Sequence, residues 1–281
     1  MTDTAAFVTF FGTGDAFAPA TQRQNLPLVT FAAYGQSGCT LLLDCGTDAK
    51  NSIRENGYEA YDIDAVYISH LHADHIGGLE WLVYSRMLNP DLPKPVLFVP
   101  AYLELPLWEC LRGGLEVTQA KTDNTLHDYF DVHLLQFGET LYAKYNNIAF
   151  SLDILEVPHI HELNANHIGT STALRINYGD SFTKHILYTS DCRYCPEVLD
   201  DWYRSSDLIL QDCSKYQATV HASYYDLKGL ATEIKAKMLL CHYQPGFVFN
   251  KEDGFLGMAW CGEVYYPTQG DRPQSTKSNK D

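Results

Sequence analysis

The sequence contains no long apolar run and no cluster of basic residues. None of its stretches reaches the roughly 18 to 20 apolar residues that a membrane-spanning helix needs, which argues against an integral membrane protein. Lysine and arginine number 20 against 35 aspartates and glutamates, which gives a formal net charge of −15 at pH 7. A chain so poor in basic residues is badly suited to binding a nucleic-acid backbone through many phosphate contacts. A small anionic substrate is compatible with this charge, because bound metal ions can dominate the local field.

Signals for secretion and for subdivision of the chain are also missing. Residues 1–11 show no basic region followed by a long apolar run, so we expect no secretory signal. No Gly/Ser/Pro-rich linker and no internal repeat divide the 281 residues, which predicts one domain over residues 1–270. Residues 271–281 contain no apolar side chain to bury and are expected to form a disordered tail.

Eight cysteines are spread along the chain, and several directly adjoin polar residues of the candidate site described below. This placement predicts free thiols packed at strand ends in a reducing compartment, and therefore a cytoplasmic protein. Cys192 and Cys195 form a CxxC pair, but no second CxxC completes a four-cysteine zinc site. A packing role is therefore favoured over a redox or zinc-binding role for this pair.

Strand-like apolar runs recur along the chain, and helical patterns separate several of them. The predicted strands are Phe7–Phe11, Leu28–Ala32, Thr40–Asp44, Ala65–Ser69, Val96–Val99, Phe150–Val157, Ser171–Asn177, His185–Thr189, Leu208–Gln211 and Met238–His242. The predicted helices are Asp74–Leu88, Leu103–Arg112 and Tyr224–Lys237. Early strands follow one another through turns, whereas later strands alternate with helices. This order favours an α/β sandwich of two mixed sheets with helices outside.

The strongest chemical signal is the segment His70-Leu-His72-Ala-Asp74-His75, which directly follows an apolar strand. Imidazole nitrogen and carboxylate oxygen together suit zinc or a similar divalent ion. At a strand end, His70 and His72 can point the same way, while Asp74 and His75 turn toward a neighbouring position. The spacing therefore predicts two adjacent metal positions.

This motif, followed by two glycines, resembles the metal motif of the metallo-β-lactamase superfamily. Three further segments resemble other elements of that superfamily in the same order. Leu41-Leu-Leu-Asp44 resembles the strand whose Asp orients the site. Leu187-Tyr-Thr-Ser-Asp191 resembles the strand that ends in the bridging Asp. Met238-Leu-Leu-Cys-His242 resembles the strand that ends in the last His ligand. The resemblance extends from about Ala6 to Pro267 and implies the superfamily's αββα sandwich.

The remaining histidine ligand of the resemblance has three candidates. His159 directly follows the predicted strand Phe150–Val157, as in the V-x-H pattern that is usual in the superfamily. His167 has the better spacing to the next strand, and His161 lies between the two. We favour His159 and keep His161 and His167 as alternatives.

The resemblance implies two divalent metal ions, zinc first, with manganese and iron as alternatives. One ion would be held by His70, His72 and His159 and the other by Asp74, His75 and His242, with Asp191 bridging both. Asp74 counts as a catalytic residue as well. A water between such ions is deprotonated near neutral pH and becomes a nucleophile, so hydrolysis is the implied reaction.

The opening segment, Val8-Thr-Phe-Phe-Gly12-Thr-Gly14-Asp-Ala-Phe17, resembles the start of the ribonuclease Z branch of the superfamily. Phosphodiesterases of that branch carry a histidine that donates a proton to the leaving oxygen, and His221 lies 21 residues before His242 in a matching place. Asp212 resembles the acid that supports this histidine, although the branch usually has Glu there. An adjacent acid favours the imidazolium that a general acid needs.

Ribonuclease Z enzymes carry a long arm for tRNA between the middle His and the bridging Asp. Here His159 and Asp191 are only 32 positions apart, so no arm fits and tRNA is disfavoured. The resemblance then implies a phosphodiesterase for a small anionic substrate such as a cyclic nucleotide, with hydrolysis of a lactone, thioester or other carbonyl compound as the alternative. A homodimer rests on the resemblance alone. The segment Leu111–Tyr145 is either a lid or dimer contact, or an ordinary surface insertion.

Overall fold

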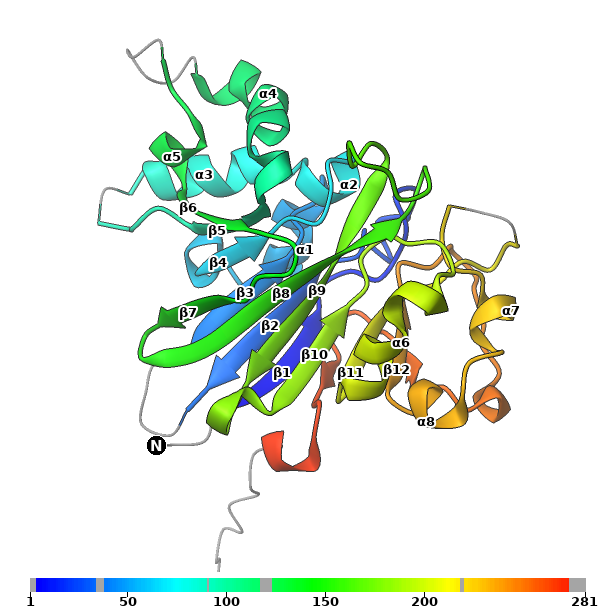
Figure 1. The fold of residues 1–281 in the computed structure, drawn as a ribbon. Helices are drawn as coiled ribbons and strands as arrows, with labels where there is room; N and C mark the ends of the chain where they lie inside the picture. The colour runs from blue at the N-terminus through cyan, green and yellow to red at the C-terminus, as the bar shows by residue number, and fades with distance from the viewer. Residues whose placement is uncertain (1–3, 34–37, 90, 117–122, 218–219, 273–281) are drawn as a thin grey trace, which may run out of the picture.

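The structure is a computed structural model that describes residues 4–33, 38–89, 91–116, 123–217 and 220–272. Its centre is two seven-stranded sheets that lie face to face (Figure 1). The first sheet consists, in chain order, of β1 (Ala5–Phe10), β2 (Pro27–Ala32), β3 (Cys39–Leu43), β4 (Ala65–Tyr67), β5 (Val96–Pro100), β6 (Asp131–Leu135) and β14 (Val264–Tyr265). The second consists of β7 (Leu141–Tyr145), β8 (Ile148–Pro158), β9 (Thr170–Tyr178), β10 (Lys184–Tyr188), β11 (Leu208–Asp212), β12 (Met238–Cys241) and β13 (Gly257–Met258).

Both sheets are mixed in the same way. In the first sheet β14, β1, β2 and β3 pair antiparallel, and β3 to β6 pair parallel. In the second sheet β7 to β10 pair antiparallel, and β10 to β13 pair parallel. Because the carboxyl ends of parallel neighbours meet at one edge of a sheet, each sheet collects several loops at the same rim.

Helices cover the outer face of each sheet. Over the first sheet lie α1 (Ala49–Glu55), α2 (Ala73–Ile76), α3 (Leu79–Met87), α4 (Glu104–Leu115) and α5 (Leu126–Tyr129), and over the second lie α6 (Pro196–Ser205), α7 (Tyr224–Leu227) and α8 (Thr232–Lys235) (Figure 1). Short 3-10 turns are η1 (Ala60–Asp62), η2 (Ala101–Leu103), η4 (Asp180–Phe182), η5 (Lys251–Asp253) and η6 (Gln269–Asp271). The αββα sandwich expected from the sequence is confirmed.

Three apolar cores hold the four layers together. Between the sheets, Phe31 of β2 stacks on Phe150 of β8 with ring centroids 4.8 Å apart. The other two cores lie between each sheet and its helices. In β3, Leu41 and Leu43 join the central core while Leu42 joins the core under the helices. Strands buried on both faces read as continuous apolar runs, which is why they were recognisable in the sequence.

Every predicted strand is confirmed, but some helix predictions are wrong. The helix predicted for Asp74–Leu88 is two helices, α2 and α3, separated at Gly77 and Gly78. The helix predicted for Tyr224–Lys237 is likewise divided into α7 and α8 around Gly229. Helices α1 and α6 and the short strands β6, β7, β13 and β14 were not predicted.

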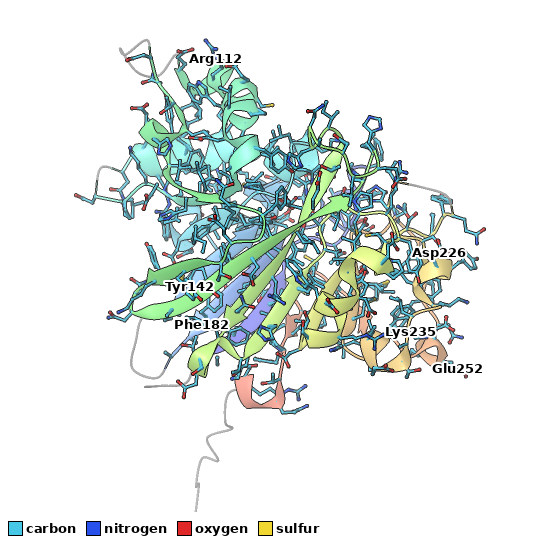
Figure 2. The ribbon with its side chains drawn as sticks, viewed as in Figure 1. Arg112, Tyr142, Phe182, Asp226, Lys235 and Glu252 are labelled. Atoms are coloured by element: carbon cyan, nitrogen blue, oxygen red, sulfur yellow. The ribbon has the colours of Figure 1, made fainter. Side chains whose placement is uncertain are left out.

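The segment Leu111–Tyr145 is built largely from regular structure. It contains the end of α4, then α5 and the edge strands β6 and β7, and its residues 117–122 lie outside the described part of the chain. Tyr142 of β7 packs against Phe182 of η4 with ring centroids 5.6 Å apart, at the end of the sandwich away from α2 (Figure 2). Charged side chains project from the outer helices, among them Arg112 on α4 and Lys235 on α8 (Figure 2).

The structure bears on the expectations for membrane helices, for the cysteines and for the C-terminal segment. Among the described residues, no helix combines the length and apolar character needed to cross a membrane. All eight cysteines are free thiols, of which Cys110 and Cys261 are exposed and the other six buried. Of the expected tail, Asp271 and Arg272 are described, and Asp271 is buried in η6. Residues 273–281 lie outside the described part.

Candidate metal centre

The polar residues of the predicted site converge at the rim where strands of both sheets end. Asp44 follows β3, the His70–His75 motif follows β4, His159 follows β8, Asp191 follows β10, and His242 follows β12. Each sheet supplies part of the cluster, because the carboxyl ends of its central strands open toward this rim. Residues far apart in the sequence are thereby brought within a few ångströms of one another.

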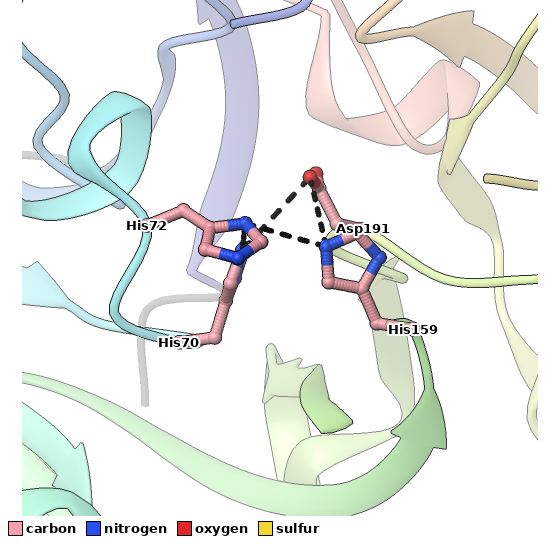
Figure 3. Close-up of side chains that lie close together, drawn as sticks. All are labelled: His70, His72, His159 and Asp191. Carbon is pink, nitrogen blue, oxygen red and sulfur yellow. Dashed lines mark hydrogen bonds and ion pairs between the residues drawn. The ribbon is translucent and has the colours of Figure 1, made fainter. Parts of the chain in front are cut away.

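A first group combines His70, His72, His159 and Asp191, whose ligand atoms all lie within 4.8 Å of one another (Figure 3). Nε2 of His70 is 3.1 Å from Nδ1 of His72, and Nε2 of His159 is 3.4 Å from the same atom. Oδ2 of Asp191 lies 3.9 Å from Nε2 of His70 and 3.8 Å from Nε2 of His159. Three imidazole nitrogens and one carboxylate oxygen form a donor set typical of zinc.

A second group combines Asp74, His75, Asp191 and His242. Nε2 of His75 and Nε2 of His242 each lie 3.3 Å from Oδ1 of Asp191 and 3.4 Å from Oδ2 of Asp74. Asp191 therefore faces one group with Oδ2 and the other with Oδ1, as the bridging position predicted from the sequence requires.

The centre contains polar atoms that the protein does not satisfy. Nε2 of His75 and Oδ1 of Asp191 are buried and have no hydrogen-bond partner among the residues that the structure describes. Buried polar atoms are rarely left unpaired, and an ion is one of the few groups that can satisfy them. The donor set and these orphaned atoms both fit a pair of divalent cations.

The protonation preferences of the histidines differ between the two groups. Burial lowers the pKa of His70 and of His159, which favours the neutral imidazoles that bind metals. Burial acts in the same direction on His75 and His242, but the Asp191 carboxylate and other nearby acids outweigh it and raise the pKa of both. Burial opposes ionisation of Asp191 as well, yet His242 and His75 hold the pKa of its carboxyl well below the usual range.

Asp44 orients the site from behind and lies outside both groups. Its fully buried carboxylate accepts hydrogen bonds from the Ser69 backbone N–H and hydroxyl and from the Tyr188 hydroxyl, at 2.8–2.9 Å. It also lies 2.8 Å from Nδ1 of His75, which turns Nε2 of that ring toward the centre. A carboxylate behind a metal-binding imidazole fixes its tautomer and increases its basicity.

A third group, made of Asp212 and His221 with Asp191 and His242, borders the other two. Oδ2 of Asp212 lies 2.8 Å from Nδ1 of His221 and also accepts the backbone N–H of Cys192 at 3.0 Å. The His221 ring stands 5.2 Å from that of His159 and 5.0 Å from that of His242. Burial opposes protonation of His221, but Asp212 and Asp191 outweigh it and raise its pKa. This is the pairing that a general acid needs.

The three candidate histidines after β8 take three different places. His159 lies in the first group, and its Nδ1 lies 2.9 Å from the Val220 carbonyl oxygen. His161 is exposed and lies against Gly169, whose added Cβ would come within 2.4 Å of the ring. His167 packs against Tyr102, with ring centroids 4.5 Å apart. Neither His161 nor His167 belongs to the described groups of potential metal ligands.

Arg193 is a supporting residue that sequence reasoning missed. Its guanidinium donates to the backbone carbonyls of His159 and Ile160 and to the Glu162 carboxylate, and its backbone N–H donates to the Pro158 carbonyl at 2.8 Å. The residue lies two positions after Asp191 and thereby ties the loop of the bridging Asp to the loop of His159. Its nearness to Asp191 was the only available signal, and that signal does not reveal a partner 34 residues away.

Comparisons with known proteins place the whole chain beside one family. A family model described as "Anti-Pycsar protein Apyc1" matches residues 7–265. Proteins of that name from Paenibacillus harenae and from Bacillus phage vB_BsuM-Goe3 are 34% and 32% identical to the chain. The first match covers 83% of this chain and 87% of the relative, and the second covers 96% and 98%. Among solved structures, the metallo-beta-lactamase fold protein YhfI from Bacillus subtilis matches with a TM-score of 0.67 and 21% identity, over 94% of this chain and 99% of the other.

Proposed function

Because the chain belongs to the family of the anti-Pycsar protein Apyc1, we propose that it is a two-metal phosphodiesterase that hydrolyses a cyclic nucleotide. Its metallo-β-lactamase fold and its family make it a metal-dependent hydrolase. The observation that carries the proposal is the Asp191 carboxylate, which faces two separate groups of ligand atoms with its two oxygens. Beside them stands an imidazole paired with a carboxylate, His221 with Asp212.

Seven residues would hold the two ions. His70, His72 and His159 would bind one, Asp74, His75 and His242 the other, and Asp191 both. Zinc suits this set best, and manganese and iron are the alternatives to test. When bound, the two ions supply a hydroxide near neutral pH and neutralise the charge that develops on the phosphoryl oxygens.

His221 would complete the reaction as the general acid. Water contributes the oxygen that forms the new bond to phosphorus, and the bond from phosphorus to the ribose oxygen breaks. That oxygen leaves with a proton from the His221 imidazolium, which Asp212 stabilises through Nδ1 so that Nε2 is the donor. The product is a nucleoside monophosphate.

The secondary structure of residues 159–191 supports a small substrate. These residues form the loop after β8, then β9, η4 and β10, so strands and their short connections take up the interval. A tRNA-binding arm has no segment here from which it could be built. The buried cysteines support a reducing compartment, the cytoplasm. The expectation of a homodimer rests on the family resemblance alone. Size-exclusion chromatography with light scattering would test it.

The test is an assay of the purified protein loaded with Zn²⁺ or Mn²⁺. A panel of 3′,5′-cyclic nucleotides, bis(p-nitrophenyl) phosphate and a lactone or thioester would be offered with and without a chelator. We expect turnover of cyclic nucleotides that stops when the metal is removed. Turnover of the lactone or thioester without turnover of the phosphodiesters would contradict the proposal and favour a carbonyl hydrolase.

A further inference from the structure

A cavity of about 200 Å³ adjoins the first group of histidines. Since a water molecule takes up roughly 30 Å³ in the liquid, the cavity has room for a group of several heavy atoms. Its wall includes His70, His72 and His159 of the first group, and also Leu103, Ile160 and His167. A substrate whose phosphate lies over the centre can therefore extend directly into the cavity.

The rest of the lining includes the apolar Leu103 and Ile160, and aromatic rings pack against His167. The His167 ring lies 4.5 Å from Tyr102 and 5.2 Å from Phe137, centroid to centroid. Tyr102 and Phe137 themselves stack, with centroids 5.8 Å apart and planes 23° from parallel. These three rings come from η2, the segment after β6 and the loop after β8, so three elements meet to present His167 at the cavity wall.

His167 is held firmly in an uncommon backbone conformation. Its φ of 55° is rare for a residue other than glycine. Nδ1 of the ring lies 2.9 Å from Oε1 of Glu156, and the Thr170 hydroxyl donates to the same Glu156 oxygen at 2.8 Å. Strain of this kind persists where the surroundings enforce it, and it is concentrated at sites of function. Packing against Tyr102 and Phe137 then holds the ring beside the cavity.

We propose that this cavity is the subsite for the nucleobase of the substrate and that His167 is a specificity-determining residue within it. The inference rests on the proposed function, because a cyclic nucleotide carries one planar base beside its phosphodiester. A planar base fits a wall of leucine, isoleucine and imidazole, because the face of any base can stack on such a ring. His167 is also one of the three histidines that the sequence marked, and the centre does not use it.

The first experiment compares His167→Ala with Asn166→Ala, an exposed neighbour in the same loop. For each protein, kcat and KM are measured with cyclic nucleotides and with methyl p-nitrophenyl phosphate, which has no base. We expect His167→Ala to raise KM for cyclic nucleotides about tenfold. The ratio of kcat/KM for cyclic nucleotide over the base-free ester should fall by the same factor, while Asn166→Ala keeps the wild-type ratio. His167→Phe, which retains a ring, should recover most of the loss.

An unchanged ratio in His167→Ala would overturn the proposal. So would a parallel loss on both substrates that His167→Phe does not recover, because that pattern indicates a structural role. A second readout does not depend on turnover: nucleoside monophosphates are titrated into metal-free protein, and transfer of saturation to the base protons is measured by NMR. Saturation transfer that is seen with the wild type and lost in His167→Ala would support the subsite. This holds even if the wild type does not hydrolyse cyclic nucleotides and the proposed function is wrong. Absence of transfer in the wild type contradicts the subsite.

Discussion

Asp212 uses its two carboxylate oxygens on two different histidines. Oδ2 lies 2.8 Å from Nδ1 of His221, and Oδ1 lies 3.4 Å from Nδ1 of His242. One buried acid therefore pairs with the proposed proton donor and lies close to a proposed metal ligand. Replacing Asp212 would disturb both functions at once, whereas replacing His221 isolates the proton transfer.

We expect His221→Ala to lower cyclic nucleotide turnover by about 10²- to 10⁴-fold, the usual contribution of a general acid. Bis(p-nitrophenyl) phosphate should lose much less, because p-nitrophenolate leaves without needing a proton. The measurements are kcat for both substrates and the metal content by mass spectrometry, with the half-exposed His133→Ala as control. Loss of a metal ion in His221→Ala would contradict the assignment and make His221 a ligand.

Arg193 acts on the centre through the backbone of its neighbours. Arg193→Met keeps the apolar stem but removes the donors to the His159 and Ile160 carbonyls. Supporting contacts of this kind typically change metal affinity by about 10- to 100-fold, so we expect a weaker site in a chelator competition assay. Arg175→Met is the matched control, since Arg175 pairs with Asp153 on the second sheet. Equal affinity in both variants would show that the Arg193 contacts do not position His159.

At the scale of elements, close backbone contacts set the loops that carry the motif. Gly46 follows β3, and a Cβ added there would lie 2.0 Å from the backbone carbonyl oxygen of Asp74. The backbone after β3 therefore passes directly beside the metal motif after β4. Glycine is required for packing at this position, since the clash is with backbone that cannot rotate away.

We expect Gly46→Ala to destabilise the protein by about 1–3 kcal/mol, the usual cost of overpacking, and to weaken metal binding by displacing Asp74. Gly113→Ala in α4 is the control, because an added Cβ there meets nothing within 4 Å. Urea unfolding of the metal-free proteins and metal titration measure the two effects. Wild-type stability in Gly46→Ala would mean that the loop after β3 can move aside.

An element can be predicted from the sequence when its own residues define it, and not when contacts with neighbouring elements define it. Strands β3 and β12 are buried on both faces, so their continuous apolar runs predict them. The edge strands β6 and β7 are half-exposed and carry mixed residues, so only pairing with their neighbours defines them. The division between α2 and α3 follows from tertiary contacts of Gly77 and Gly78, which a helical pattern does not contain.

The candidate site was largely predictable for a related reason. The ligand types cluster in a short motif or end a strand, and both patterns are local. The choice of His159 over His161 and His167 stayed open because all three follow the same strand, and only the fold of the loop after β8 separates them. Arg193 and the Val220 carbonyl act across 34 and 61 residues, so no local pattern could identify them.

At the scale of the whole molecule, Asp271 links the C-terminal segment to both sheets. Its buried carboxylate accepts hydrogen bonds from the Tyr178 hydroxyl at 2.9 Å, from Nζ of Lys184 at 3.1 Å and from the Ala6 backbone N–H at 3.4 Å. The first two partners belong to β9 and β10 and the last to β1. Residues near the end of the described chain therefore help to hold the sandwich together.

We expect Asp271→Asn to lower the free energy of unfolding by about 1–3 kcal/mol, the cost of leaving buried groups imperfectly paired. The exposed Asp180→Asn should stay within about 0.5 kcal/mol of the wild type. Urea denaturation monitored by tryptophan fluorescence measures both. Equal midpoints for the two variants would show that the η6 contacts contribute little to stability.

The order of the ligands along the chain has a consequence for synthesis. The first four proposed ligands are complete once residue 75 has left the ribosome, but Asp191 and His242 emerge only after most of β7 to β12. A nascent chain can therefore gather a partial, mostly histidine set long before the bridging carboxylate exists. Correct filling of both positions has to follow closure of the second sheet on the first, so the complete centre cannot form before His242 has left the ribosome.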